Sequence, residues 1–188
     1  MTTPLPYKIA VLCYLFDARG RLLLIHRLNE PNKGLYSPIG GKLQMELGES
    51  PAQCAQREIE EEAGIHVDLA DLHLTGLVSE RAFAGQTHWL MFCYEVMTPV
   101  VVTRTQIREG KLEWHDPATI EQLNIPETDR QVIWPLFQNF RGQFFHVHID
   151  CAAGQGDEGT KEQKGQKGQN GQNGISLQWR LEYPRPRK

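Results

Sequence analysis

The stretch from residue 40 to 65 constrains this chain more than any other part of the sequence. It joins a glycine-rich loop to a segment whose two ends both carry helix signals. Ser50 is a good N-cap, Pro51 suits the first helical position, and Gln53 can complete a capping box. Gly64 favours a C-terminal stop. The sequence therefore predicts a short helix that begins at Pro51 and ends before Gly64.

The predicted helix is acidic. Residues three and four positions apart lie one above another on a helix, so Glu58, Glu61 and Glu62 share a face, while Glu60 points elsewhere. One interpretation is a solvated acidic surface, which is what most charge runs are. The other is a cation site, because glutamate oxygens are hard ligands that suit Mg²⁺ or Mn²⁺. The glycine-rich loop favours the second interpretation, since such loops let backbone groups approach phosphates closely.

This segment resembles the signature of the Nudix hydrolases. The positions that match at the family spacing are Glu49, Arg57, Glu58, Ile59, Glu61, Glu62, Gly64 and Ile65. One departure is visible, because seven residues instead of five separate Gly41 from Glu49, which leaves two extra residues around Gln44 and Met45. The resemblance implies an α/β/α sandwich with a mixed β-sheet. It also implies Mg²⁺-dependent hydrolysis of diphosphate linkages, with Mn²⁺ as an alternative metal.

The resemblance assigns roles within the signature. It implies that Glu58, Glu61 and Glu62 hold the metal, together with the backbone carbonyl of Gly40. Arg57 is expected to orient Glu58 or its neighbours through a salt bridge.

Two basic residues are candidates to bind the phosphates of a substrate. Arg27 stands where a predicted strand leaves the core, and Lys42 directly follows the glycine pair. Arginine suits phosphates but is also common on surfaces, so an ordinary surface position is the alternative for Arg27.

A further carboxylate is expected to face the metal helix. In the resembling family, a glutamate from a loop shortly before a tryptophan does so, as a metal ligand or as the base that activates water. Glu109 fits this placing before Trp114, and Glu113 is its competitor. The resemblance therefore leaves Glu109 and Glu58 as the two candidates for the general base.

The C-terminal half is similar to the enzymes that hydrolyse oxidised purine nucleoside triphosphates. In that branch, acidic residues after a proline hydrogen-bond the edge of the base, and Asp129 after Pro126 is the matching acid. We therefore expect a nucleoside triphosphate, with oxidised purines among the candidates, to be cleaved to the monophosphate and pyrophosphate. The alternatives are ADP-ribose or another nucleotide sugar, a non-nucleotide diphosphate, and a nucleotide-binding module without catalysis.

The rest of the chain predicts strands and short helices around this segment. Apolar runs predict strands at residues 7–16, 21–27, 72–80, 87–97, 144–150 and 175–183, the first two paired as a hairpin. Helices are predicted at residues 118–123 and 130–140, with a kink or late start at Pro135, and residues 104–114 are expected to form a loop.

Length and composition fit a single domain spanning residues 1–188. Residues 152–174 are rich in Gly, Gln and Lys, and they predict a flexible insertion. A net charge of −3 gives no basic surface for a nucleic acid polymer. The sequence shows no membrane-spanning run and no signal peptide, so we expect a cytoplasmic protein whose partner is a small nucleotide. Its four scattered cysteines predict buried, reduced thiols.

Overall fold

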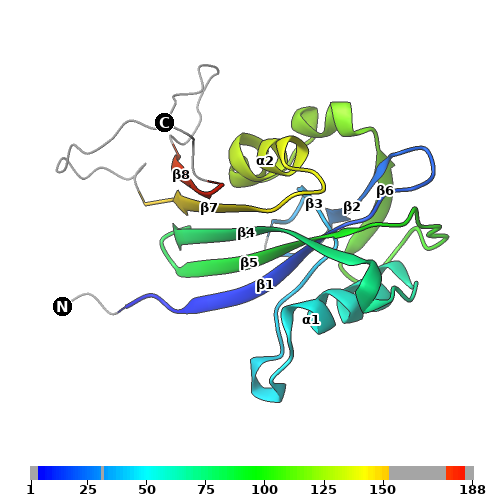
Figure 1. The fold of residues 1–188 in the computed structure, drawn as a ribbon, viewed down its shortest axis with the longest axis horizontal. Helices are drawn as coiled ribbons and strands as arrows, with labels where there is room; N and C mark the ends of the chain where they lie inside the picture. The colour runs from blue at the N-terminus through cyan, green and yellow to red at the C-terminus, as the bar shows by residue number, and fades with distance from the viewer. Residues whose placement is uncertain (1–3, 31, 153–176, 185–188) are drawn as a thin grey trace.

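Among the residues that the computed structural model describes (4–30, 32–152 and 177–184), two β-sheets lie between helices (Figure 1). A five-stranded mixed sheet has the order β1-β5-β4-β7-β8, and a three-stranded antiparallel sheet has the order β3-β2-β6. The strands are β1 (Tyr7–Tyr14), β2 (Leu22–Arg27), β3 (Tyr36–Ser37), β4 (Leu72–Phe83), β5 (Thr87–Val96), β6 (Gly110–His115), β7 (Phe145–Asp150) and β8 (Gln178–Tyr183). The predicted fold class is confirmed.

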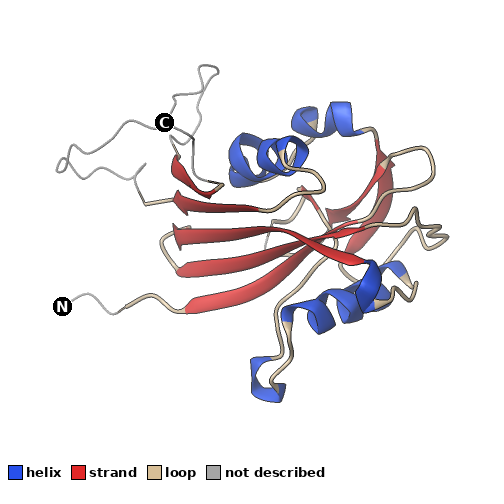
Figure 2. Ribbon diagram, viewed as in Figure 1, coloured by secondary structure: helices blue, strands red, loops and turns tan. Residues whose placement is uncertain are grey.

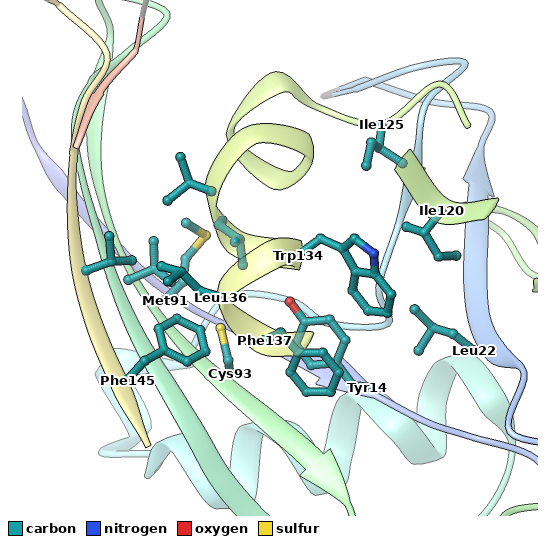
Figure 3. Packing of buried hydrophobic residues seen from close by; sticks show 14 of the residues in the cluster. Tyr14, Leu22, Met91, Cys93, Ile120, Ile125, Trp134, Leu136, Phe137 and Phe145 are labelled. Carbon is teal, nitrogen blue, oxygen red and sulfur yellow. The ribbon is translucent and has the colours of Figure 1, made fainter. Parts of the chain in front are cut away.

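Helices cover both sides of the strands (Figure 2). The two α-helices are α1 (Pro51–Glu58) and α2 (Trp134–Asn139), and they lie on opposite sides (Figure 1). On the α2 side an aromatic cluster fills the core, with the rings of Tyr14 and Phe137 4.0 Å apart (Figure 3). On the α1 side the core takes in the small side chains of Cys54 and Ala55 and the larger Ile59. The α1-side core thus anchors α1 against the sheet.

The acidic helix forms as predicted at both ends. The Ser50 hydroxyl accepts a hydrogen bond from the backbone N–H of Gln53, and the Gln53 side chain accepts one from the N–H of Ser50, which completes the capping box. After α1 the chain continues into a π-helical turn, Ile59–Ala63, and Gly64 ends it in the left-handed conformation. The two extra loop residues belong to a short 3₁₀ helix, Met45–Leu47, and its neighbourhood.

The predicted hairpin of residues 7–27 is wrong in its pairing. β1 runs parallel to β5, whereas β2 pairs with β3 and β6 in the other sheet. The hairpin forms only at its turn end, where Phe16 bridges Leu22 and the N–H groups of Asp17 and Leu23 donate to the carbonyls of Arg21 and Leu15. Both strands are buried on two faces: Leu22 and Leu24 pack on the α2 side, and Leu23 and Ile25 pack on the α1 side. Such strands carry no alternation that would assign them to one sheet.

The prediction of a loop at residues 104–114 is correct as far as residue 109 and wrong beyond it, because β6 begins at Gly110. Leu112 is buried in the α1-side core and Trp114 packs against it, while Lys111 and Glu113 alternate with them on the other face. The strand is short and half polar, so it resembles a loop in composition.

The remaining elements agree with the sequence in type or place. The predicted helix at 118–123 is a 3₁₀ helix, Pro117–Gln122, which Asp116 caps through the N–H of Ala118. A further 3₁₀ helix spans Leu69–Asp71, and a π-helical turn, Asp129–Ile133, precedes α2. Residues 127–139 are helical without a break, so a late start is wrong: Pro135 lies inside this run, directly after the π-helical turn.

Three further points concern the cysteines, membrane-spanning helices and the predicted insertion. The cysteines Cys13, Cys54, Cys93 and Cys151 are unpaired, and the first three are buried. No helix within the described residues combines the length and the apolarity needed to cross a membrane. The predicted insertion at 152–174 falls outside the described residues, apart from residue 152.

Gly76 allows β7 to lie against β4, and its replacement tests this packing. A Cβ atom at Gly76 would lie 2.4 Å from the buried ring of Phe145. We expect Gly76→Ala to lower the free energy of unfolding by about 1–3 kcal/mol, measured by urea denaturation. Phe145→Leu removes the ring that the new Cβ would meet, so the double variant should lose less stability than the sum of the losses in the two single variants. Strictly additive losses would contradict the contact.

Candidate active site

The glycine loop lies between β1 and the acidic helix. It runs along β1 through hydrogen bonds from the N–H groups of Val11 and Cys13 to the carbonyls of Gly41 and Ile39, at 2.9 and 2.7 Å. On its other side, the N–H of Gly40 donates to Oε2 of Glu62 at 3.1 Å. The carboxylate of Glu62 therefore contacts a loop whose backbone is itself hydrogen-bonded to the sheet.

Glycine is required here by close approach. A Cβ at Gly40 would lie 2.1 Å from the carbonyl oxygen of Val11. A Cβ at Gly41 would lie 2.1 Å from Oε1 of Glu58, so this carboxylate rests directly over the Gly41 backbone. Any larger residue at Gly41 would occupy the place of the carboxylate.

Arg57 joins the carboxylates of the site. Its guanidinium bonds Glu49 at 2.7 Å, Glu58 at 2.7 Å and Glu61 at 3.3 Å, and it also donates to the backbone carbonyl of Lys42 at 3.2 Å. The hydrogen bonds from Arg57 hold the pKa of Glu49 below its usual range. The predicted salt bridge between Arg57 and Glu58 is present, and the two extra loop residues leave the contact with Glu49 intact.

Glu62 is a buried carboxylate, and only one of its two oxygens has a hydrogen-bond partner. Its side chain belongs to a residue only 6% exposed, and its Oε1 is buried without a hydrogen-bond partner. Burial raises the pKa of Glu62 to about 8, the Gly40 N–H opposes this shift, and the charges of Glu109 and Glu58 add to it. Burial likewise raises the pKa of Glu58 in spite of the bond from Arg57. The site therefore holds more negative charge than its protein partners neutralise.

The three predicted metal ligands do not meet at one point in this structure. Arg57 holds Glu58 and Glu61, Glu62 turns to Gly40, and the side chain of Glu61 is 58% exposed. Across the described residues, no three His, Cys, Asp or Glu side chains are gathered closely enough to hold a metal ion. The unpartnered Oε1 of Glu62 and the hard oxygen donors around it nevertheless suit a divalent cation. The assignment of the metal ligands stays a prediction.

Glu109, and not Glu113, faces the acidic helix. Glu109 forms an ion pair with Arg27 at 3.0 Å, and its charge raises the pKa of both Glu58 and Glu62. Its backbone carbonyl accepts a hydrogen bond from Leu28 at 2.8 Å, which fixes the turn before β6 to the end of β2.

Glu113 lies elsewhere. It accepts a hydrogen bond from the Tyr36 hydroxyl at 2.9 Å and lies beside His115, on the face of the small sheet where His26 stacks on Tyr36. The structure therefore brings Arg27 and Glu109 to the helix and leaves Glu113 in a separate polar cluster.

Lys42 is exposed, and its ammonium lies over the ring of Trp89, 6.0 Å from the centroid. Its backbone carbonyl accepts a hydrogen bond from Arg57, so Lys42 borders the site, while its side chain points to Trp89 on β5.

Asp129 lies with a second buried acid that the sequence reasoning missed. Asp129 is in the π-helical turn before α2, and its charge acts on Glu80, Tyr14 and Cys93. Glu80 is only 3% exposed and belongs to β4. Burial raises the pKa of each carboxyl to about 7, and in Glu80 the charge of Asp129 adds to the effect. One signal could have revealed Glu80: it falls two residues after Val78, at an inward position of an alternating strand.

Comparisons with known proteins agree with this geometry. The family model described as NUDIX domain matches residues 6–137. The "Uncharacterized Nudix hydrolase YvcI" of Bacillus subtilis is 30% identical over 109 residues, which are 56% of this chain and 66% of that protein, just under two thirds of its length. The "RNA pyrophosphohydrolase" of Sphingopyxis alaskensis is 28% identical over 138 residues, 65% of this chain and 85% of that protein. The crystal structure of a MutT protein from Bacillus halodurans has a TM-score of 0.66 at 22% identity, covering 95% of this chain and 99% of that one.

The fold and the signature segment thus define a domain of the NUDIX class. The chain belongs to the Nudix family, with MutT proteins among its structural neighbours. The resemblance of residues 40–65 to the Nudix signature is confirmed.

The two glycines of the loop should respond differently to alanine. In Gly41→Ala the new Cβ meets only the end of the flexible Glu58 side chain, so the carboxylate moves and the fold stays. In Gly40→Ala the Cβ meets the backbone of Val11, which cannot move aside. We expect Gly40→Ala to lose about 1–3 kcal/mol in urea denaturation, and Gly41→Ala to unfold like the wild type while binding Mn²⁺ more weakly. Equal stability losses in both variants would contradict this geometry.

The Glu80–Asp129 pair should make stability depend on pH. Both carboxyls hold their protons more tightly in the folded protein than in the unfolded chain, where they titrate near about 4. The unfolded chain therefore binds fewer protons between these values, and the free energy of unfolding should fall as pH rises from about 4 through about 7. Glu80→Gln removes one titrating group and should flatten this fall by on the order of 2 kcal/mol. The free energy of unfolding is measured by urea denaturation at a series of pH values. If it falls with pH as steeply in Glu80→Gln as in the wild type, the prediction is wrong.

Proposed function

We propose that this protein hydrolyses a nucleoside triphosphate to the monophosphate and pyrophosphate with Mg²⁺, for which Mn²⁺ can substitute. Purine nucleotides, oxidised ones included, are the substrates that the C-terminal half favours. The observation that carries the proposal is Glu62, a buried carboxylate with an unpartnered oxygen, which lies against the glycine loop with the charges of Glu58 and Glu109 nearby. A surface that served only for solubility would not bury such a group.

The residues that would hold the cation are Glu58, Glu61 and Glu62, together with the carbonyl of Gly40. A divalent cation bound there neutralises the charge that develops on the phosphates when a diphosphate linkage breaks. Because Arg57 engages Glu58 and Glu61, we assign it the role of orienting these carboxylates.

The remaining charged residues divide the chemistry between them. Arg27 and Lys42 are assigned to the phosphates, and Arg27 is the better placed because its guanidinium already contacts a carboxylate of the site, Glu109. Hydrolysis forms a bond from the water oxygen to one phosphorus and breaks the P–O–P bridge, and a carboxylate takes the proton of the water. Glu109 and Glu58 remain the candidates for this base, since both lie at the acidic helix.

The second acidic pair supports recognition of a base. Because burial raises the pKa of both carboxyls to about 7, each can act near neutral pH as a hydrogen-bond donor when protonated or as an acceptor when ionised. The edge of a purine offers donors and acceptors side by side. We assign Asp129 to this edge, with Glu80 as its partner.

Glutamine at Glu62 should separate catalysis from folding. Glu62→Gln keeps the size of the side chain but removes the charge that would hold the cation, so Mg²⁺-dependent turnover should fall roughly a hundredfold or more. Turnover is measured on a panel of nucleotides by the release of pyrophosphate as opposed to inorganic phosphate. The matched control is Glu60→Gln, which removes a charge from the same helical turn at an exposed position and should turn over like the wild type.

The same assay decides against the proposal if Glu62→Gln keeps near-normal turnover. A wild-type protein that binds nucleotides but releases no product with any divalent metal would be a binding module. Release of two mononucleotides, or hydrolysis of ADP-ribose in preference to triphosphates, would agree with the proposed cation site but would contradict the proposed substrate.

A further inference from the structure

The end of the acidic helix is held by a residue that the proposed chemistry does not use. Arg104 lies in the segment between β5 and β6, residues 97–109, and its guanidinium donates to the carbonyl of Glu61 at 2.6 Å and to that of Glu62 at 3.4 Å. The last carbonyls of a helix have no partner within the helix and carry its partial negative charge, so an arginine suits this position. The two carbonyls belong to two of the three glutamates assigned to the cation.

Gly64 makes room for this contact. It ends the π-helical turn with φ +71°, and a Cβ there would lie 3.0 Å from the Arg104 guanidinium. The guanidinium thus packs directly on the helix stop. Arg57 and Arg104 also line one surface groove of about 480 Å³, where the first holds the carboxylate of Glu61 and the second its carbonyl.

The segment beyond Arg104 leads directly to Glu109. The carbonyl of Thr105 accepts a hydrogen bond from Leu112 at 3.0 Å, and the N–H of Ile107 donates to Gly110 at 2.9 Å, so residues 105–112 form a tight turn with Glu109 near its tip. Arg104 stands at the base of this turn. Through it, one side of the turn is tied to the helix that carries Glu58 and Glu62.

We propose that Arg104 is a positioning residue: it ties the turn that carries Glu109 to the C-terminal end of the acidic helix and so sets where Glu109 stands relative to Glu58 and Glu62. The inference rests on the proposed function, and it adds a residue outside the signature segment. An arginine that merely capped the helix would affect stability without affecting the turn.

The test compares Arg104→Ala with two further variants. Arg104→Lys keeps the charge but replaces the planar guanidinium, one nitrogen of which reaches both carbonyls, with a compact ammonium on a flexible stem, so it should be intermediate. Arg108→Ala is the matched control, because Arg108 lies in the same turn and its side chain makes no hydrogen bond or ion pair with the described residues. Each protein is assayed for kcat and KM with Mg²⁺ and the best nucleotide of the panel. Hydrogen–deuterium exchange of residues 104–112 is measured without substrate.

We expect Arg104→Ala to lower kcat about tenfold with KM nearly unchanged, and to speed exchange in the turn, because a displaced catalytic group costs rate more than binding. Arg108→Ala should resemble the wild type in both readouts. A kcat close to the wild-type value in Arg104→Ala overturns the proposal, and so does a loss of kcat without faster exchange in the turn. If the wild type turns over no nucleotide, the proposed function fails, and the exchange measurement alone decides whether Arg104 ties the turn.

Discussion

The close approach of the glycine loop to the acidic helix is the contact on which the site depends. Gly40 donates its N–H to Glu62, and Glu58 lies over Gly41 where no side chain would fit. Because the same loop bonds β1 on its other side, the positions of the carboxylates are set by the central sheet and not by the helix alone. Arg57 then completes the arrangement from the solvent side by bonding Glu49, Glu58 and Glu61.

This arrangement concentrates negative charge in a partly dry place. Arg57 and Arg27 face a larger number of carboxylates, and Glu62 keeps one buried oxygen without a partner. A buried charge of this kind weakens the folded state unless another positive charge joins it. The fold tolerates the cost because the α1-side core beneath the helix is made of well-buried apolar residues. Such a balance is common at functional sites, where stability is given up for a group that must bind something.

The sheet separates two acidic centres that would perform different tasks. Glu58, Glu61 and Glu62 belong to the α1 side, whereas Glu80 and Asp129 belong to the α2 side beside the aromatic cluster. Strand β2 contributes to both sides, since Ile25 packs toward α1 and Leu24 toward α2.

The sequence alone determined the features that are local. The capping box of Ser50 and Gln53, the stop at Gly64 and the spacing of the glutamates are read from neighbouring residues, because helix ends and helix faces are set within a few positions. The family followed from the same short segment. The tertiary structure decided everything that joins distant residues. It placed β1 and β2 in different sheets, set Glu109 and not Glu113 beside the acidic helix, and put Glu80 within reach of the charge of Asp129. Strand pairing depends on which buried strands meet, and a strand buried on both faces has no hydrophobic alternation from which its partner could be predicted. The burial of a polar side chain likewise depends on which distant residues pack against it.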